Sequence, residues 1–222
     1  MGSHDLGDYM ILDAIKSGTQ ALRADLQVIA DLMEPGSRVL DVGCGDGSLL
    51  AYLTKRKQVD GRGVEISQAG VNSCVAHGLS VIQGDVDTDL KDYPSDAFDY
   101  VVLSQTLQAT NNPKFVISEM VRIGRRAIVS FPNFGFWRVR FHLLLQGRMP
   151  VTETLDYAWY ETPNIHLCTL KDFIATCGEV GVTIEKGIAL ARTGRTGNIS
   201  PTGLFANLLA EQGVYLLKRD GN

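Results

Sequence analysis

The amino-acid sequence predicts an α/β fold in which a mostly parallel sheet is covered by helices on both faces. From Arg38 to Phe131, segments of strand length alternate with segments of helical periodicity, as they do in βαβ units. The strand segments are nearly continuous apolar runs such as Asp99–Ser104, which are typical of strands buried on both faces. A glycine cluster follows the first strand and opens a helix, which places a ligand site at the carboxyl end of that strand.

Seven strands and the helices between them can be assigned in order along the chain. We expect strands over Arg38–Val42, Gly61–Glu65, Ser80–Gln83, Asp99–Ser104, Arg126–Phe131, Val182–Ala191 and Val214–Lys218. We expect helices over Ser48–Lys57, Ser67–His77, Lys114–Ile123 and Leu170–Val180. Thr169-Leu170-Lys171-Asp172 supplies a capping signature for the last helix, and the polar, glycine-rich stretch Arg192–Gly203 predicts a loop.

Residues 133–168 interrupt the alternation and show neither period clearly. A segment of this length between a strand and a helix is usually functional, so we expect a lid inserted after the fifth strand. Residues 131–160 hold 8 of the 17 aromatic residues, including both tryptophans, and residues 120–152 hold six arginines and no acidic residue. Residues 134–149 resemble an amphipathic helix that closes a pocket or meets a partner, although a peripheral helix with solvated arginines has the same pattern.

Length and composition limit the classes of function. The 222 residues, 45% of them hydrophobic, are enough for the core of one generous domain. A formal net charge of −4 argues against binding of the whole protein to nucleic acid or to an anionic membrane. We expect no transmembrane helix and no signal peptide, and four cysteines without a zinc-site spacing predict reduced thiols, no metal and a cytoplasmic location.

The expected domain covers residues 23–222. An extension over residues 1–22 precedes it, and its first four residues, Met-Gly-Ser-His, are typical of a cloning remnant. Within the domain, the lid insertion covers residues 133–168.

The glycine cluster, Asp41-Val42-Gly43-Cys44-Gly45-Asp46-Gly47-Ser48, is the sharpest local signal. A dinucleotide fold would have its third glycine at Ser48, and a phosphate-binding P-loop would need a lysine that is absent, so both alternatives fail. The carboxylate of Asp41 would repel a pyrophosphate. It would attract the ammonium group of an amino-acid ligand instead.

Two further acidic residues follow the next two strands. Glu65 ends the second strand, where a carboxylate can accept both hydroxyl groups of a ribose. Asp85 follows the third strand, where it can accept a hydrogen bond from an adenine amino group. Each acid alone has an ordinary alternative as a cap or a surface charge. Three acids in order at strand ends favour a cationic nucleoside ligand.

This ordered set resembles the class I S-adenosylmethionine-dependent methyltransferases over residues 23–191. The resemblance implies a Rossmann-like, seven-stranded fold and S-adenosylmethionine, or S-adenosylhomocysteine as product, as ligand. The positions it implies for that ligand are Asp41, Gly43, Cys44, Gly45, Gly47, Glu65, Ile66, Gly84, Asp85, Val86, Ser104 and Gln105. Arg23 could meet the ligand carboxylate or be a solvated helix charge.

A more specific resemblance is carried by three stretches in and around the lid. Phe131-Pro132-Asn133-Phe134-Gly135, Gly147-Arg148-Met149-Pro150-Val151-Thr152 and the run from Tyr157 to Thr169 are similar to the MetW family of methionine biosynthesis proteins. This family implies a supporting or regulatory role beside homoserine O-acyltransferase. In that case we expect the basic, aromatic segment over residues 134–149 to be a docking surface for that enzyme. Methyl transfer to a small-molecule acceptor is the alternative function, and sequence does not separate the two.

Two lid residues are candidates for chemistry if methyl transfer occurs. His166 could act as a general base, or it could bond to backbone and order the lid. Tyr160 and its neighbour Trp159 could wall an acceptor site or belong to the core.

Overall fold

A computed structural model of the chain describes residues 22–152, 155, 157–191, 196–197 and 204–220. The extension expected over residues 1–22 therefore lies outside the described residues, apart from Leu22. Within the described ranges, no helix is long and apolar enough to cross a membrane.

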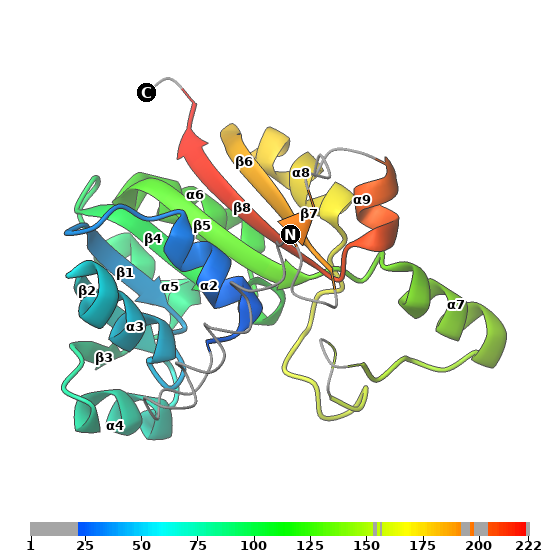
Figure 1. Cartoon of the computed structure of the whole chain (residues 1–222), viewed down its shortest axis with the longest axis horizontal. Helices are drawn as coiled ribbons and strands as arrows, with labels where there is room; N and C mark the ends of the chain where they lie inside the picture. The colour runs from blue at the N-terminus through cyan, green and yellow to red at the C-terminus, as the bar shows by residue number, and fades with distance from the viewer. Residues whose placement is uncertain (1–21, 153–154, 156, 192–195, 198–203, 221–222) are drawn as a thin grey trace, which may run out of the picture.

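The strands form one twisted sheet that runs through the middle of the molecule (Figure 1). They are β1 (Arg38–Val42), β2 (Asp60–Glu65), β3 (Val81–Gln83), β4 (Phe98–Ser104), β5 (Gly124–Pro132), β6 (Val182–Leu190), β7 (Thr196–Gly197) and β8 (Gln212–Arg219). Their order is β3-β2-β1-β4-β5-β8-β6-β7, with β1 to β5 parallel and β8 antiparallel to both β5 and β6. All seven expected strands are present.

The prediction of a loop over residues 192–203 is wrong at two residues. Thr196 and Gly197 form β7, which pairs antiparallel with Ala189 and Leu190 at the end of β6. The remaining residues of that stretch lie outside the described part of the chain.

Helices cover both faces of the sheet, as expected. They are α2 (Ala24–Asp31), α3 (Ser48–Lys57), α4 (Gln68–Ala76), α5 (Val86–Asp89), α6 (Pro113–Ile123), α7 (Trp137–Gln146), α8 (Leu170–Glu179) and α9 (Leu204–Leu209), with short 3-10 turns η1 (Leu90–Asp92) and η2 (Leu107–Ala109). The capping box predicted for α8 is present, because Thr169 and Asp172 exchange side-chain and backbone hydrogen bonds.

Alternate residues of each central strand pack into two different cores. Val39 of β1 lies in the cluster formed with α2 and α3, whereas its neighbour Leu40 lies in the cluster formed with α6 and α8. Val101 and Val102 of β4 divide in the same way. Because both faces are buried, the strands present polar groups mainly at their ends, and the carboxyl ends of β1, β2 and β4 meet at one edge.

Residues 133–168, the expected lid, leave the body of the molecule and return to it; we call them the arm. Figure 1 shows α7 standing away from the sheet, with the chain after α7 returning to the body at α8. The two ends of the arm are joined, since Phe134 donates a backbone hydrogen bond to Cys168. The end of the arm that returns to the body is also held in place, because the amides of Ile165 and His166 both donate to the Gln108 carbonyl.

Asn133 ties the base of the arm to the body. Its buried side chain donates to the carbonyls of Asn207 and Ala210 and accepts from the amides of Gly135 and Leu170. One side chain thus joins α9, the start of the arm and the start of α8.

We expect Asn133→Ala to lower the free energy of unfolding by about 3 kcal/mol or more, because it leaves several buried backbone groups without partners. Asn112→Ala is the matched control: Asn112 only caps α6 through the Phe115 amide, so its loss should cost about 1 kcal/mol. Urea unfolding of both variants measures the difference. Equal costs would contradict the role assigned to Asn133.

Candidate functional site

A cavity of about 450 Å³ lies at the carboxyl ends of β1 and β4. Its volume is within the range of small-molecule sites, and its position is the one at which open α/β sheets bind ligands. The glycine loop forms one wall, the start of α2 and the end of β4 form others, and the arm closes part of the mouth. The cavity is therefore built from segments far apart in the sequence.

The glycine loop turns sharply at the end of β1. Gly43, Gly45 and Gly47 all have positive φ angles, which glycine adopts without steric cost. The loop is held to β2, because the amides of Gly43 and Cys44 donate to the Val64 carbonyl. Burial raises the pKa of the Cys44 thiol, so Cys44 remains a neutral side chain of the cavity wall.

Asp41 is the most unusual group in the cavity. Its side chain is 1% exposed, and its Oδ1 atom has no hydrogen-bond partner among the described residues. Burial raises the pKa of Asp41 to about 7; the Arg23 guanidinium opposes this shift, and the nearby carboxylates Glu65 and Asp46 add to it. A buried carboxylate without a partner is costly unless a cationic ligand or a proton neutralises it.

Glu65 supports the loop from the end of β2. Its two carboxylate oxygens accept hydrogen bonds from the amides of Gly45 and Ser67, at 2.9 Å each. A carboxylate has about four acceptor positions, so Glu65 keeps capacity for ligand hydroxyl groups. Its neighbour Ile66 is 65% exposed and leaves an apolar surface beside that carboxylate.

The third acidic position has a structural partner. Asp85 caps the short helix α5 by accepting from the Asp87 amide, which the sequence did not predict. Gly84 donates its amide to the Glu65 carbonyl, and Val86 begins α5. Six predicted ligand positions are not part of the cavity lining: Gly47, Glu65, Ile66, Gly84, Asp85 and Val86.

Seven predicted positions do line the cavity. They are Arg23, Asp41, Gly43, Cys44, Gly45, Ser104 and Gln105. Arg23 is bound by Asp25, a buried residue that the sequence analysis missed, through two 3.0 Å hydrogen bonds. Nothing in the sequence distinguishes Asp25 from an ordinary surface charge on a helix.

The arm contributes Tyr157, Pro163 and Asn164 to the lining. The two residues proposed for chemistry, Tyr160 and His166, are exposed and are not part of this lining. The His166 backbone amide donates to the Gln108 carbonyl; this hydrogen bond does not involve the imidazole, so the general-base role and the lid-ordering role of that ring both stay predictions. Tyr157 belongs to the same aromatic run, but no periodicity in that run indicates which tyrosine faces inwards.

We expect Gly45→Ala to weaken binding of S-adenosylmethionine, the ligand implied by the resemblance, by at least about tenfold. The new methyl group would meet none of the described residues within 4 Å and would occupy open space at the cavity lining, while the positive φ of Gly45 adds about 1 kcal/mol of strain. Gly36→Ala is the matched control, since Gly36 has a similar φ and equal space but lies outside this cavity. Calorimetry should show weaker binding for Gly45→Ala alone; equal affinities of the two variants would contradict the placement.

Comparison with known proteins agrees with this architecture. A family model described as "Methionine biosynthesis protein MetW" matches residues 23–217. A relative, the bifunctional methionine biosynthesis protein MetXA/MetW of Rhodopirellula baltica, is 36% identical over 176 residues, which cover 75% of this chain. The matched part is 28% of that relative, so the chain spans little more than a quarter of its length.

Solved structures with the same fold share little sequence with this chain. An S-adenosylmethionine-dependent methyltransferase from Mesorhizobium loti has a TM-score of 0.65 at 15% sequence identity. The superposition covers 89% of this chain and 98% of the methyltransferase chain. The [4+2]-cyclase SpnF has a TM-score of 0.61 at 16% identity, covering 87% of this chain and 80% of its own. These likenesses show the fold alone, and they confirm the expected Rossmann-like methyltransferase fold.

Proposed function

Because this chain belongs to the MetW family of methionine biosynthesis proteins, we propose that it binds S-adenosylmethionine in the β1 cavity and supports or regulates homoserine O-acyltransferase through its arm. The observation that supports the ligand part of the proposal is the buried Asp41 Oδ1 atom, which has no hydrogen-bond partner among the described residues. The observation that carries the partner half is the exposed apolar and basic surface of α7.

The cavity residues suit a sulfonium nucleoside with an amino-acid group. Asp41 would accept the ligand ammonium, Glu65 would accept ribose hydroxyl groups, and the glycine loop leaves room for close approach. Arg23 lies in the same lining and carries the opposite charge, which suits the ligand carboxylate. A zwitterionic group therefore finds a partner for each of its charges.

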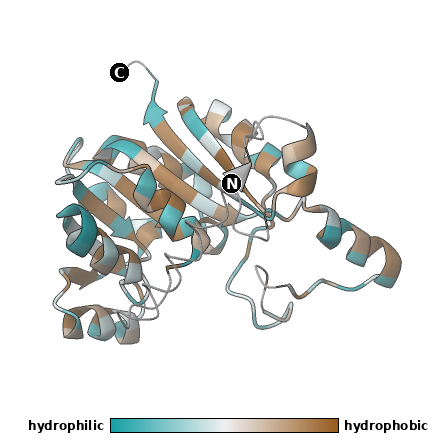
Figure 2. Ribbon diagram, viewed as in Figure 1, coloured by the Kyte–Doolittle hydropathy of each residue, from teal (hydrophilic) through white to brown (hydrophobic). Residues whose placement is uncertain are grey.

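The arm provides a surface for a protein partner. Trp137, Phe141, Leu144 and Leu145 lie at helical spacing on α7, and they are 39%, 53%, 78% and 74% exposed. Figure 2 shows hydrophobic residues at the end of α7 farthest from the sheet. Such a stripe is the pattern that an amphipathic helix presents to a groove on a partner.

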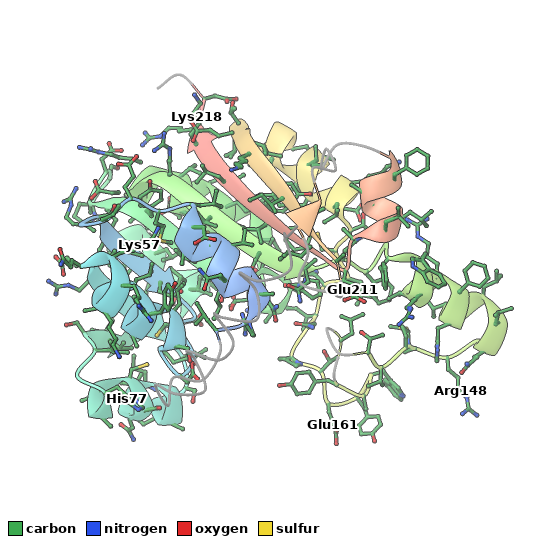
Figure 3. All side chains as sticks on the ribbon, viewed as in Figure 1. Lys57, His77, Arg148, Glu161, Glu211 and Lys218 are labelled. Carbon is green, nitrogen blue, oxygen red and sulfur yellow. The ribbon has the colours of Figure 1, made fainter. Side chains whose placement is uncertain are left out.

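The charge of residues 134–149 favours an acidic partner, because this segment holds three arginines and no acidic residue. Arg138, Arg140 and Arg148 are exposed on and beside α7, and Figure 3 shows Arg148 at the far end of the arm. The relative from Rhodopirellula baltica joins a MetXA part and a MetW part in one chain, which supports a physical association of the two. We place this association in the cytoplasm, where the four free cysteines would stay reduced.

An acyltransferase assay with and without this protein, at varied S-adenosylmethionine, tests the proposal. We expect the acyltransferase rate to differ with and without this protein. We expect the difference between the two rates to depend on the concentration of S-adenosylmethionine. A rate that responds to neither addition would overturn the regulatory role.

Methyl transfer is the alternative function. The ligand would supply an electrophilic methyl group, and positioning of an acceptor would provide much of the catalysis. Tyr157 and Asn164 of the arm line the same cavity and could orient a small acceptor. Transfer of label from methyl-labelled S-adenosylmethionine to a small molecule of a cell extract, lost in Tyr157→Ala, would favour this alternative.

A further inference from the structure

We propose that buried Asp25 makes the cavity selective for ligands with a free carboxylate, by fixing the Arg23 guanidinium in the cavity wall. This inference rests on the proposed binding of S-adenosylmethionine and goes beyond it, because it assigns the discrimination to a residue that touches no ligand. Asp25 acts through Arg23 and is therefore a positioning residue.

The Asp25 carboxylate is fully engaged by the protein. Oδ1 accepts from Arg23 Nε at 3.0 Å, and Oδ2 accepts from Arg23 Nη2 at 3.0 Å, from Ser130 Oγ at 3.1 Å and from Gln105 Nε2 at 3.3 Å. The residue is 1% exposed and belongs to α2, whereas Ser130 lies within β5 and Gln105 follows β4. One buried carboxylate thus joins three elements around the cavity.

This network fixes the guanidinium in orientation as well as in position. The two parallel hydrogen bonds form a fork that holds the plane of the Arg23 guanidinium. Nη2 also reaches Ser104 Oγ at 3.5 Å. Nη1 donates no hydrogen bond to the described residues, so both of its hydrogens are available to a ligand.

The Arg23 side chain is 52% exposed although its partner Asp25 is buried. An exposed arginine normally loses side-chain entropy when it is ordered, and a surface ion pair contributes little. Here the acceptor is desolvated and held by other donors, so the arginine is ordered before a ligand arrives. Pre-ordering reduces the entropy cost of binding.

Gln105 gives a second indication that the network serves the site. It has a φ of 50°, in the left-handed region that costs a residue with a side chain about 1 kcal/mol or more. Its amide donates to the Ser130 carbonyl and its side chain reaches Asp25. Both ends of this strained residue are therefore held by the groups that surround Asp25, and Gln105 itself lines the cavity.

Opposite charges on the cavity lining complete the argument. Arg23 and Asp41 both belong to the lining, one cationic and the other able to accept an ammonium group. A ligand without a carboxylate would satisfy Asp41 and leave the Arg23 donors unpaired. The cavity should therefore reject nucleosides that keep the amino group and lack the carboxylate.

Calorimetry with two probes tests this inference. The probes are S-adenosylmethionine and decarboxylated S-adenosylmethionine, which keeps the sulfonium, the nucleoside and the amino group. We expect the parent protein to bind the first probe about 10- to 100-fold more tightly. Asp25→Asn should reduce the ratio of the two affinities by about tenfold, mainly by weakening the binding of S-adenosylmethionine, the probe that has the carboxylate.

Ser130→Ala provides a second, milder variant in case Asp25→Asn does not fold. Ser130 is fully buried and does not line the cavity, and the hydroxyl that Ser130→Ala removes donates to Asp25. We expect the ratio to fall by about threefold. Arg23→Gln should lower the ratio because it removes the charge and the forked pair of hydrogen bonds. Arg23→Lys keeps the charge and loses the fork, so its ratio should lie between those of Arg23→Gln and the parent.

Arg38→Gln is the matched control, because Arg38 also pairs with an aspartate, Asp99, but at the opposite edge of the sheet. It should leave both affinities unchanged. Equal binding of the two probes by the parent, or an unchanged ratio in Asp25→Asn and Ser130→Ala, would overturn the inference and leave the proposed function intact. Failure of the parent to bind either probe would overturn both.

Discussion

Replacing Asp41 with asparagine is expected to reduce the affinity for S-adenosylmethionine by at least about 100-fold while stabilising the ligand-free protein above pH 7. Removing one partner of a buried charge pair costs about 3–5 kcal/mol, which accounts for the loss of affinity. Without ligand, the same carboxylate is buried and its Oδ1 atom has no partner among the described residues, so its ionisation opposes folding.

The direction of the pH effect follows from the pKa of Asp41. Burial raises this pKa from 3.8 to about 7, so the folded protein holds a proton that the unfolded chain has already released. The contribution of Asp41 to stability is therefore lost as the pH rises from about 4 to about 7. The full shift corresponds to about 4 kcal/mol, and Asp41→Asn should flatten this part of the profile.

Ligand binding should show the opposite dependence on pH. A proton competes with the ligand ammonium for the Asp41 carboxylate, so affinity should fall about tenfold for each pH unit below 7. Calorimetry at pH 5, 6 and 8 measures this slope, and urea unfolding over the same range measures stability.

Asp46→Asn is the control for the stability measurement. The Ser48 hydroxyl donates to Asp46, and this hydrogen bond is the main reason why the pKa of Asp46 lies below its usual value. Asp46 therefore contributes stability that is present at neutral pH and lost in acid, so its replacement should bring no gain above pH 7. If the stability of Asp41→Asn depends on pH in the same way as that of the parent, the assignment of a raised pKa to Asp41 is wrong.

The double substitution Phe141→Glu and Leu145→Glu on α7 is expected to abolish co-purification with homoserine O-acyltransferase, weakening association at least about 100-fold. Both side chains belong to the exposed apolar stripe, with Phe141 packed edge-on against Trp137 at 6.0 Å between ring centroids. Two carboxylates would have to be desolvated in the partner's apolar groove. Because both positions are exposed, folding stability should change by less than about 0.5 kcal/mol each.

Val75→Glu on α4 is the matched control, since Val75 is 57% exposed and α4 lies at the other end of the sheet from the arm (Figure 1). Arg148→Glu tests the electrostatic part and should slow association most at low salt. Arg140 is a poorer choice, because its Nε donates to the Gly135 carbonyl at 2.6 Å and its loss would also disturb the arm. Association that survives the double substitution would exclude α7 as the docking surface.

The sequence predicted what short-range patterns determine. Alternating apolar strands and helices led to the fold, and the spacing of three glycines after Asp41 located the cavity. Strand β7 was missed because two residues carry no period, and their pairing depends on where the end of β6 lies.

Long-range packing determines the parts of the site that the sequence did not reveal. Asp25 looks like a solvated helix charge, and only its partners Gln105 and Ser130, 80 and 105 residues away, show that it is buried and bonded. In the arm, the choice between Tyr157 and Tyr160 depends on how the returning chain crosses η2. Asp85 was assigned to adenine, and the structure gives it a local partner at the start of α5.

The arm also makes the protein its own optical probe. Both tryptophans of the chain, Trp137 and Trp159, lie on it, at 39% and 73% exposure. Fluorescence excited selectively in tryptophan therefore arises from the arm alone, with no background from the sheet or its helices. A change in emission on adding a nucleoside or a protein partner would report an event at the arm without any label attached.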